Sequence, residues 1–169
     1  PKIEILLSYL KIGRLKMNFE GKVAVITGSS AGIGAEAAKK ISALGGKVTI
    51  NYSKSKEAAE EVAHECSHLG GSPLIIKSDI ATDEGCKHLI DSAFRELGAI
   101  NILINNAGRT KFADHSNLDA LQRDDFENIL ALNLNSNYEL IKHARPHLAK
   151  NKKSSIVNIS SVAGLRGLG

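Results

Sequence analysis

The sequence has little of several features that mark particular classes of protein. Only 4% of its 169 residues are aromatic, so the side chains on which single-stranded nucleic acids stack are scarce. No apolar run approaches the ~20 residues that a bilayer helix requires, because stretches such as ILLSYL and ILIN are soon followed by polar residues. Internal repeats and low-complexity tracts are absent as well. We therefore expect an ordinary soluble globular domain.

Cysteine is also scarce. Cys66 and Cys86 lie far apart in the sequence and form no CxxC pair. We interpret both as reduced residues that pack in the interior, which suits a reducing compartment as well as any other. The expected location is the cytoplasm.

The net charge of +4 comes from 22 Lys and Arg against 18 Asp and Glu. A basic balance can indicate a nucleic-acid partner, but here the basic residues are spread along the chain instead of forming a stripe. We expect neither nucleic acid nor a membrane as a partner.

The first sixteen residues differ in composition from the rest. They carry four basic residues and one acidic residue, whereas Met17 opens a segment that reads like a natural start. Ile3, Leu6, Leu7 and Leu10 follow helical spacing, which would suit an organellar targeting peptide. A targeting peptide of that kind has many serines and no acidic residue, whereas this segment has one Ser and one Glu. We interpret residues 1–16 as an extension outside the fold and residues 17–169 as one domain.

From Lys22 onward, short β-branched runs alternate with longer helical patterns. The predicted strands cover residues 22–27, 47–52, 73–80, 100–108 and 154–160, and the predicted helices cover residues 33–44, 56–69, 83–97 and 124–150. This alternation predicts a doubly wound α/β fold, with a parallel sheet and helices on both faces. Ligands of such sheets bind at the carboxyl ends of the strands, where the strand order reverses.

The first strand runs into a glycine-rich turn, TGSSAGIG, that leads directly into a helix. Gly28 can take the tight turn, Gly32 lets the backbone approach a pyrophosphate, and Gly34 allows close packing of helix and strand. The spacing is GxxxGxG instead of the GxGxxG of the common dinucleotide fingerprint. The position between a strand and a helix nevertheless favours dinucleotide binding.

Several motifs together resemble the short-chain dehydrogenase/reductase family. They are TGSSAGIG, Asp79 after the third strand, the NNAG segment that ends the fourth strand, an Asn in the following long helix, and NISS after the fifth strand. The resemblance covers residues 19–169. It implies a Rossmann-fold NAD(P)-binding oxidoreductase that transfers a hydride between the cofactor and a small carbonyl or alcohol substrate.

The resemblance also implies roles for individual residues. The catalytic Asn matches Asn133 and the catalytic Ser matches Ser161, while a helix-kinking Asn and a strand-end turn Ser are the structural alternatives. The implied cofactor-binding residues are Thr27, Gly28, Ser30, Ala31, Gly32, Ile33, Gly34, Ser53, Lys54, Asp79, Ile80, Asn106, Ala107 and Gly108.

Family members carry a catalytic Tyr soon after that Ser, and a Lys one helical turn beyond the Tyr. Counting from Ser161 places both past Gly169. We expect a fold that is incomplete on its C-terminal side, with an apolar strand edge at residues 156–159. The 169-residue chain would then be an inactive part of a longer enzyme. The alternative is a noncatalytic dinucleotide-binding or regulatory module.

The end of the second strand bears on cofactor choice. NAD enzymes place an acid about twenty residues after the glycine turn, whereas a basic residue there accepts the 2′-phosphate of NADP. This strand is followed by Ser53, Lys54 and Ser55, with no acid before Glu57. We expect NADP, with Lys54 as the phosphate ligand and either serine as a neutral donor. A solvated loop lysine is the alternative, and Ala31 stands where many NADP-preferring relatives carry a basic residue.

The segment HECSH matches the HExxH motif of zinc metalloproteases. On a helix, His64 and His68 point away from the apolar stripe of Ala59, Val62, Cys66 and Leu69, and two glycines follow without a third ligand. We expect no metal at this segment.

The long helix after Asn133 is apolar on two sides. Leu134, Tyr138, Ile141 and Leu148 fall near one face, and Leu140, Ala144 and His147 near another. In the family that the chain resembles, the matching helix packs against its twin. We therefore expect a homodimer or a homotetramer for the whole protein, and aggregation of the 169-residue chain.

Overall fold

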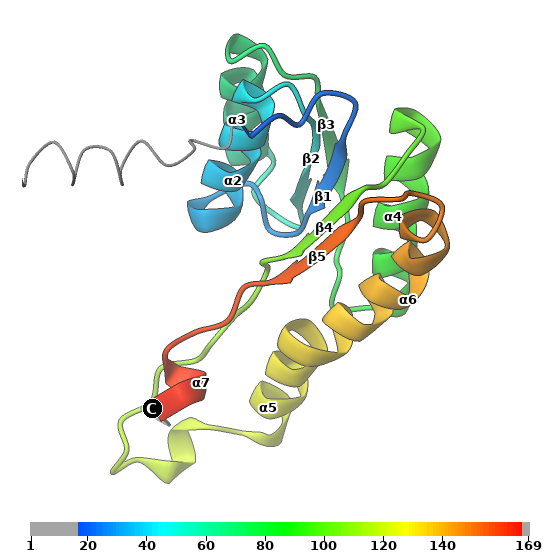
Figure 1. The fold of residues 1–169 in the computed structure, drawn as a ribbon. Helices are drawn as coiled ribbons and strands as arrows, with labels where there is room; N and C mark the ends of the chain where they lie inside the picture. The colour runs from blue at the N-terminus through cyan, green and yellow to red at the C-terminus, as the bar shows by residue number, and fades with distance from the viewer. Residues whose placement is uncertain (1–16, 167–169) are drawn as a thin grey trace, which may run out of the picture.

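The computed structural model of the chain describes residues 17–166, and the predicted extension at residues 1–16 lies outside them. Five parallel strands form one sheet in the order β3-β2-β1-β4-β5 (Figure 1). The strands are β1 (Val23–Ile26), β2 (Lys47–Tyr52), β3 (Pro73–Lys77), β4 (Ile102–Asn105) and β5 (Ser155–Asn158). From β1 the chain builds outward to β2 and β3, then crosses to β4 and β5, so the order reverses between β1 and β4.

Helices cover both faces of the sheet, as the sequence predicts (Figure 1). Helices α2 (Gly32–Ala43) and α3 (Lys56–His68) pack on one face, and α4 (Asp83–Leu97) and α6 (Ser136–Leu148) pack on the other. Ala24 and Ile26 of β1 contact the first pair, whereas Val25 contacts the second pair. The short apolar run of β1 is therefore buried from both sides, which is typical of a central parallel strand.

Four of the five strands are shorter than predicted at their carboxyl ends, whereas β2 ends at Tyr52 as predicted. Residues 78–80 after β3 and 106–108 after β4 leave the ladder and form loops. These loops contribute to a cleft instead of continuing the sheet. The sequence predicts the apolar part of each strand correctly, since in β1, β2 and β4 that part is buried and β5 continues the same β-branched pattern.

The predicted helix over residues 124–150 is divided into three parts. These are α5 (Arg123–Leu130), a π-helical turn (Ala131–Asn135) and α6. A π turn contains one residue more than an α turn, so the two helices do not share one face pattern. Leu148 is buried together with Leu140 and Ala144, which corrects its assignment to the same face as Leu134 and Tyr138. Leu134 and Tyr138 are more than half exposed.

Both cysteines are free and buried, which confirms their interpretation as packing residues. Burial raises the pKa of the Cys86 thiol to about 12 and also raises the pKa of the Cys66 thiol. Leu69 is exposed, contrary to the predicted stripe of α3, because it lies past the last turn of the helix. Within residues 17–166, no helix has the length and hydropathy to cross a membrane.

Candidate functional site

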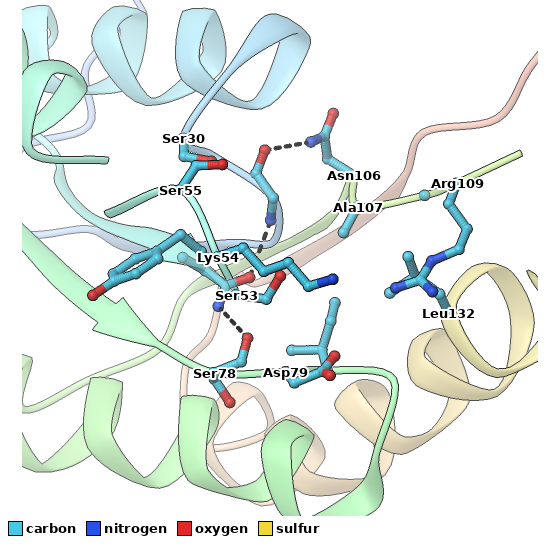
Figure 2. A pocket seen from close by; sticks show the side chains of 15 residues that line it. Ser30, Ser53, Lys54, Ser55, Ser78, Asp79, Asn106, Ala107, Arg109 and Leu132 are labelled. Atoms are coloured by element: carbon cyan, nitrogen blue, oxygen red, sulfur yellow. Dashed lines mark hydrogen bonds between the residues drawn. The ribbon is translucent and has the colours of Figure 1, made fainter. Parts of the chain in front are cut away.

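A cleft of about 400 Å³ lies at the carboxyl ends of β1, β2, β3 and β4 (Figure 2). Nine of the predicted cofactor-binding residues line it: Gly28, Ser30, Ser53, Lys54, Asp79, Ile80, Asn106, Ala107 and Gly108. Its other lining residues are Asn51, Tyr52, Ser55, Ser78, Arg109 and Leu132. The cleft includes the point between β1 and β4 where the strand order reverses, the place expected for a ligand of a doubly wound sheet.

The turn after β1 is tied to the turn after β4. Thr27 Oγ1 accepts hydrogen bonds from the backbone N–H groups of Asn106 (2.9 Å) and Ala107 (3.0 Å). The side-chain amide of Asn106 donates in return to the carbonyl oxygens of Thr27 (2.9 Å) and Gly28 (3.2 Å). Thr27 is buried beneath the turn and does not line the cleft. Its hydrogen bonds hold the two turns in place relative to each other.

Two glycines of this turn perform the roles predicted for them. Gly28 has a φ of +59°, and a Cβ there would lie 3.0 Å from Ala107 Cα. A Cβ on Gly34 would lie 2.6 Å from Asn106 Nδ2 and 2.8 Å from the Gly28 carbonyl oxygen. The contacts at Gly34 are closer than real Cβ atoms show, and at Gly28 the positive φ already disfavours a side chain, so the turn and the start of α2 pack as closely as glycine permits.

The start of α2 lacks a side-chain cap. Ala31 precedes the helix and accepts no bond through its side chain, so the first N–H groups of the helix retain their capacity to donate. Gly32 has a φ of +56°, with open space where a Cβ would be. Ala31, Gly32, Ile33 and Gly34 do not line the cleft, and Ile33 is 63% exposed. They form a helix N-terminus of the kind that binds anions.

Asn51 of β2, which the sequence analysis did not select, links the loops after β1 and β3. Its Oδ1 accepts the Gly28 N–H at 3.1 Å, and its Nδ2 donates to the carbonyl oxygen of Ser78 at 3.3 Å. A buried asparagine within the apolar strand KVTINY was the available signal, because a buried amide requires partners.

Lys54 lies on the loop after β2 and reaches into the cleft beside Ser53 and Ser55 (Figure 2). It forms no ion pair with any residue of the 17–166 region. Lys56, two positions later, is paired with Glu60 at 3.3 Å and lies outside the cleft. The position of Lys54 therefore fits an anionic ligand.

The opposite wall of the cleft is mainly apolar. Ile80, Ala107 and Leu132 line it, with the Asp79 carboxylate beside them. Asp79 Oδ1 accepts the N–H of Ala81 at 3.1 Å, which fixes the loop after β3. An apolar slot with a polar edge suits a flat heteroaromatic ring. Leu132 comes from the π-helical turn and could not be assigned without the three-dimensional structure.

The two catalytic candidates do not line the cleft. Asn133 Oδ1 accepts the backbone N–H of Arg109 at 2.9 Å, and its Nδ2 donates to the Arg109 carbonyl oxygen at 2.8 Å. Ser161 is exposed, and its Oγ accepts the N–H of Ala163 at 3.2 Å, just before α7 (Ala163–Arg166). The contacts of both residues match the structural alternatives given for them above.

Two groups of possible metal ligands lie away from the cleft. His64 and His68 are exposed, with their Nε2 atoms 3.1 Å apart. Asp83, Glu139 and His143 form a second group between α4 and α6, where Lys142 bonds Glu139 at 2.7 Å. The hydrogen bond from His143 is the main cause that lowers the pKa of Asp83. This second group is an ion-pair network that joins two helices.

A family model described as short chain dehydrogenase matches residues 22–169. A 3-oxoacyl-[acyl-carrier-protein] reductase of Synechocystis sp. is 33% identical over 146 residues, which are 86% of this chain and 58% of that protein. A short chain dehydrogenase of Burkholderia cenocepacia, solved in complex with NADP, superposes with a TM-score of 0.84 at 32% identity. The alignment covers 90% of this chain and 60% of that one.

A second solved structure carries the other nicotinamide cofactor. A 7α-hydroxysteroid dehydrogenase in complex with NADH and a 7-oxo bile acid superposes with a TM-score of 0.80 at 32% identity, covering 88% of this chain and 56% of that one. The chain thus spans somewhat less than two thirds of the length of the relatives that it matches. Both nicotinamide dinucleotides occur among the structural neighbours.

Proposed function

We propose that this chain, which belongs to the short-chain dehydrogenase family, is the dinucleotide-binding part of an NADP(H)-dependent oxidoreductase. Its substrate would be a small carbonyl compound or alcohol. The observation that carries the proposal is the cleft itself, where part of the glycine turn, an apolar slot and a cationic side chain surround one space, and the turn leads directly into an uncapped helix start. We also propose the cytoplasm as its location, with which two buried free thiols are compatible.

The residues present fit NADP. The glycine turn and the first N–H groups of α2 would hold the pyrophosphate, since Gly32 leaves open space for its close approach. The slot of Ile80, Ala107 and Leu132 would hold the adenine. Lys54 would bind the 2′-phosphate, with Ser53 or Ser55 as a neutral donor. When bound, NADP(H) supplies the hydride equivalent of the reaction.

Ser161 and Asn133 would serve the substrate side. The Ser161 oxygen accepts a backbone N–H, so its own proton remains available for a substrate carbonyl oxygen. Asn133 holds the segment after β4 through both atoms of its amide, and the resemblance also assigns it a proton-relay water. The proton donor would be a Tyr past Gly169, assisted by a Lys. The 169-residue chain is then inactive by itself.

The noncatalytic dinucleotide-binding module is the second candidate. It is favoured by the position of Ser161 and Asn133 outside the cleft. A carbonyl-reduction assay of a chain that continues past Gly169 distinguishes the enzyme from the noncatalytic module. An enzyme loses roughly 100-fold in rate on Ser161→Ala, because a donor to the developing oxyanion is removed. A module shows no NADPH oxidation with any carbonyl compound.

Self-association is part of the proposal. Phe126, Leu130, Leu134 and Tyr138 recur every four residues along α5, the π turn and α6, and all are more than half exposed. Exposed apolar side chains of this kind suit a self-complementary interface in a homodimer or homotetramer. Light scattering tests it on the longer protein. A monomer there would contradict the interface.

Cofactor choice is tested by titrating NADPH and NADH and following nicotinamide fluorescence. We expect NADPH to bind more tightly by roughly 10-fold to 100-fold, because charge-assisted hydrogen bonds contribute about 1.5–3 kcal/mol. Lys54→Asp should invert the preference by replacing attraction with repulsion. The matched control is Lys56→Asp, which changes a paired lysine outside the cleft and should keep the preference. Equal affinity for both cofactors in the unmodified chain would refute the choice.

A further inference from the structure

We propose that Arg109 is a second cation that recognises the 2′-phosphate, together with Lys54. This inference rests on the proposed function, since it concerns the selectivity of the same cleft. Arg109 directly follows the NNAG segment after β4 and lines the cleft. Figure 2 shows its side chain and that of Lys54 reaching into the cleft from opposite walls.

Lys54 and Arg109 are the two basic residues among those that line the cleft. Elsewhere in the described residues some basic side chains, such as Lys56 and Arg123, have an acidic partner, and others, such as Lys22, have none. Neither Lys54 nor Arg109 has one among the residues that the structure describes. Asp79, the carboxylate of the cleft, makes its hydrogen bond to a backbone N–H instead. Two cations that face one cleft repel each other unless an anion lies between them.

The backbone of Arg109 is fixed before any ligand binds. Both of its polar backbone groups bond to the side chain of Asn133, at 2.9 and 2.8 Å. Only the side chain therefore has to be ordered when it contacts a ligand, which lowers the entropic cost of binding. This contact connects the family's Asn position with cofactor selectivity, with Asn133 as a positioning residue.

The ligand chemistry follows from the two head groups. A phosphate monoester carries a charge of about −1.5 to −2 at pH 7, which a lysine and an arginine together balance. The guanidinium offers a planar pair of donors to two phosphate oxygens, and the ammonium offers a point charge. A ribose hydroxyl in the same place would leave both cations unpaired. The pair therefore selects for the phosphorylated ribose.

The test uses two fragments of the cofactor as probes. Adenosine 2′,5′-bisphosphate carries the 2′-phosphate and adenosine 5′-monophosphate lacks it, so the ratio of their dissociation constants isolates that group. Arg109→Gln should weaken binding of the bisphosphate about tenfold, as expected for the loss of one charge-assisted hydrogen bond, and change binding of the monophosphate less than about twofold. Arg109→Lys should restore part of the ratio. Arg123→Gln, which removes a paired arginine of α5, should change neither constant.

Three outcomes would overturn the inference. A bisphosphate affinity that Arg109→Gln leaves unchanged means that Arg109 does not contact the ligand. An equal loss for both probes means that Arg109 recognises the 5′-phosphate or the adenosine. An unmodified chain that binds neither probe overturns the proposed function itself, and this inference with it.

Discussion

Strands β1 and β5 belong to one sheet but have opposite surroundings. Each residue of β1 is at most 3% exposed, because β2 and β4 flank the strand and helices cover both of its faces. Every residue of β5 is exposed, with Ile156 at 44% and Val157 at 42%. Within the described residues, β5 lies at the sheet edge with β4 as its single neighbour.

The same contrast in burial holds for the functional residues, because the cleft lies at the buried strands whereas Ser161 follows the exposed strand β5. The cleft is built on loops that follow β1, β2, β3 and β4, and the side chains of Thr27 and Asn51 bond to the backbones of these loops. Ser161 follows β5 and makes its side-chain bond within its own turn. The packed half can therefore hold a dinucleotide in a fixed geometry, while the position of Ser161 depends on local bonds.

The largest effect is expected from truncating partners across the β4–β5 ladder. Leu103 and Ile156 are register partners, but Leu103 is fully buried. Leu103→Ala should lower the free energy of unfolding by about 3–4 kcal/mol, and Ile156→Ala by less than ~1 kcal/mol, because only the first leaves a cavity. Urea denaturation followed by circular dichroism measures both, since the chain has no Trp. Similar losses of unfolding free energy for the two variants would contradict the contrast between the buried strands and the exposed strand β5.

A smaller effect is expected from adding one methyl group to a glycine in each half. Gly34→Ala should cost about 1–3 kcal/mol, because its Cβ would overlap the Asn106 amide and the Gly28 carbonyl. Gly164→Ala is the matched control, since its Cβ would meet Ser160 Oγ at an ordinary 3.8 Å. The same denaturation experiment applies. NADPH affinity should fall with Gly34→Ala alone, and unchanged affinity would argue against the glycine turn as the pyrophosphate site.

Acid should loosen the segment between β4 and α5. Lys111 bonds Asp125 at 2.6 Å and, as the main cause, lowers its pKa. A carboxyl whose pKa is lower in the folded state contributes its full stabilisation above the unfolded pKa of about 3.9, and the contribution is lost as the pH falls through the folded value. At about pH 4, Asp125→Asn should be cut by pepsin within residues 109–122 roughly 2-fold to 5-fold faster than the unmodified chain.

The pH dependence of the cleavage rate distinguishes restraint by the Lys111–Asp125 ion pair from a general flexibility of the segment. As the pH falls further below 4, the cleavage rates of the two proteins should converge, because the Asp125 carboxylate becomes protonated in the unmodified chain as well. The variant, assayed at each pH, controls for the pH dependence of pepsin itself. A rate ratio that stays constant would show that the ion pair does not restrain the segment.

The smallest effect is expected at the HECSH segment. Replacing both His64 and His68 with Gln should change the free energy of unfolding by no more than ~0.5 kcal/mol, because both side chains are exposed. NADPH affinity should also stay the same, since α3 presents them away from the cleft lining. Stoichiometric zinc that disappears with the double substitution would contradict the view of this motif as accidental.

The sequence predicted the order and type of the strands and helices because apolar periodicity directly reflects which side of an element is buried. It also predicted the glycine turn and Lys54, which are local in sequence. Asn51, Arg109 and Leu132 were not selected, because their place in the cleft depends on how three distant segments meet. The π turn was missed since its residues, ALNLN, continue a helical pattern. The face of Leu148 was assigned wrongly for another reason: it lies four residues after Ala144 and eight after Leu140 in the same helix, so the helical period itself places it with them.

The central claim, that the packed half of the sheet binds a dinucleotide, is tested most directly by hydrogen exchange with and without NADPH. The account predicts slower exchange in the loops after β1, β2, β3 and β4, at residues 28–34, 52–55, 78–81 and 106–109. It predicts unchanged exchange in β5. Protection confined to residues 155–166, or no protection at the four loops under saturating NADPH, would contradict it.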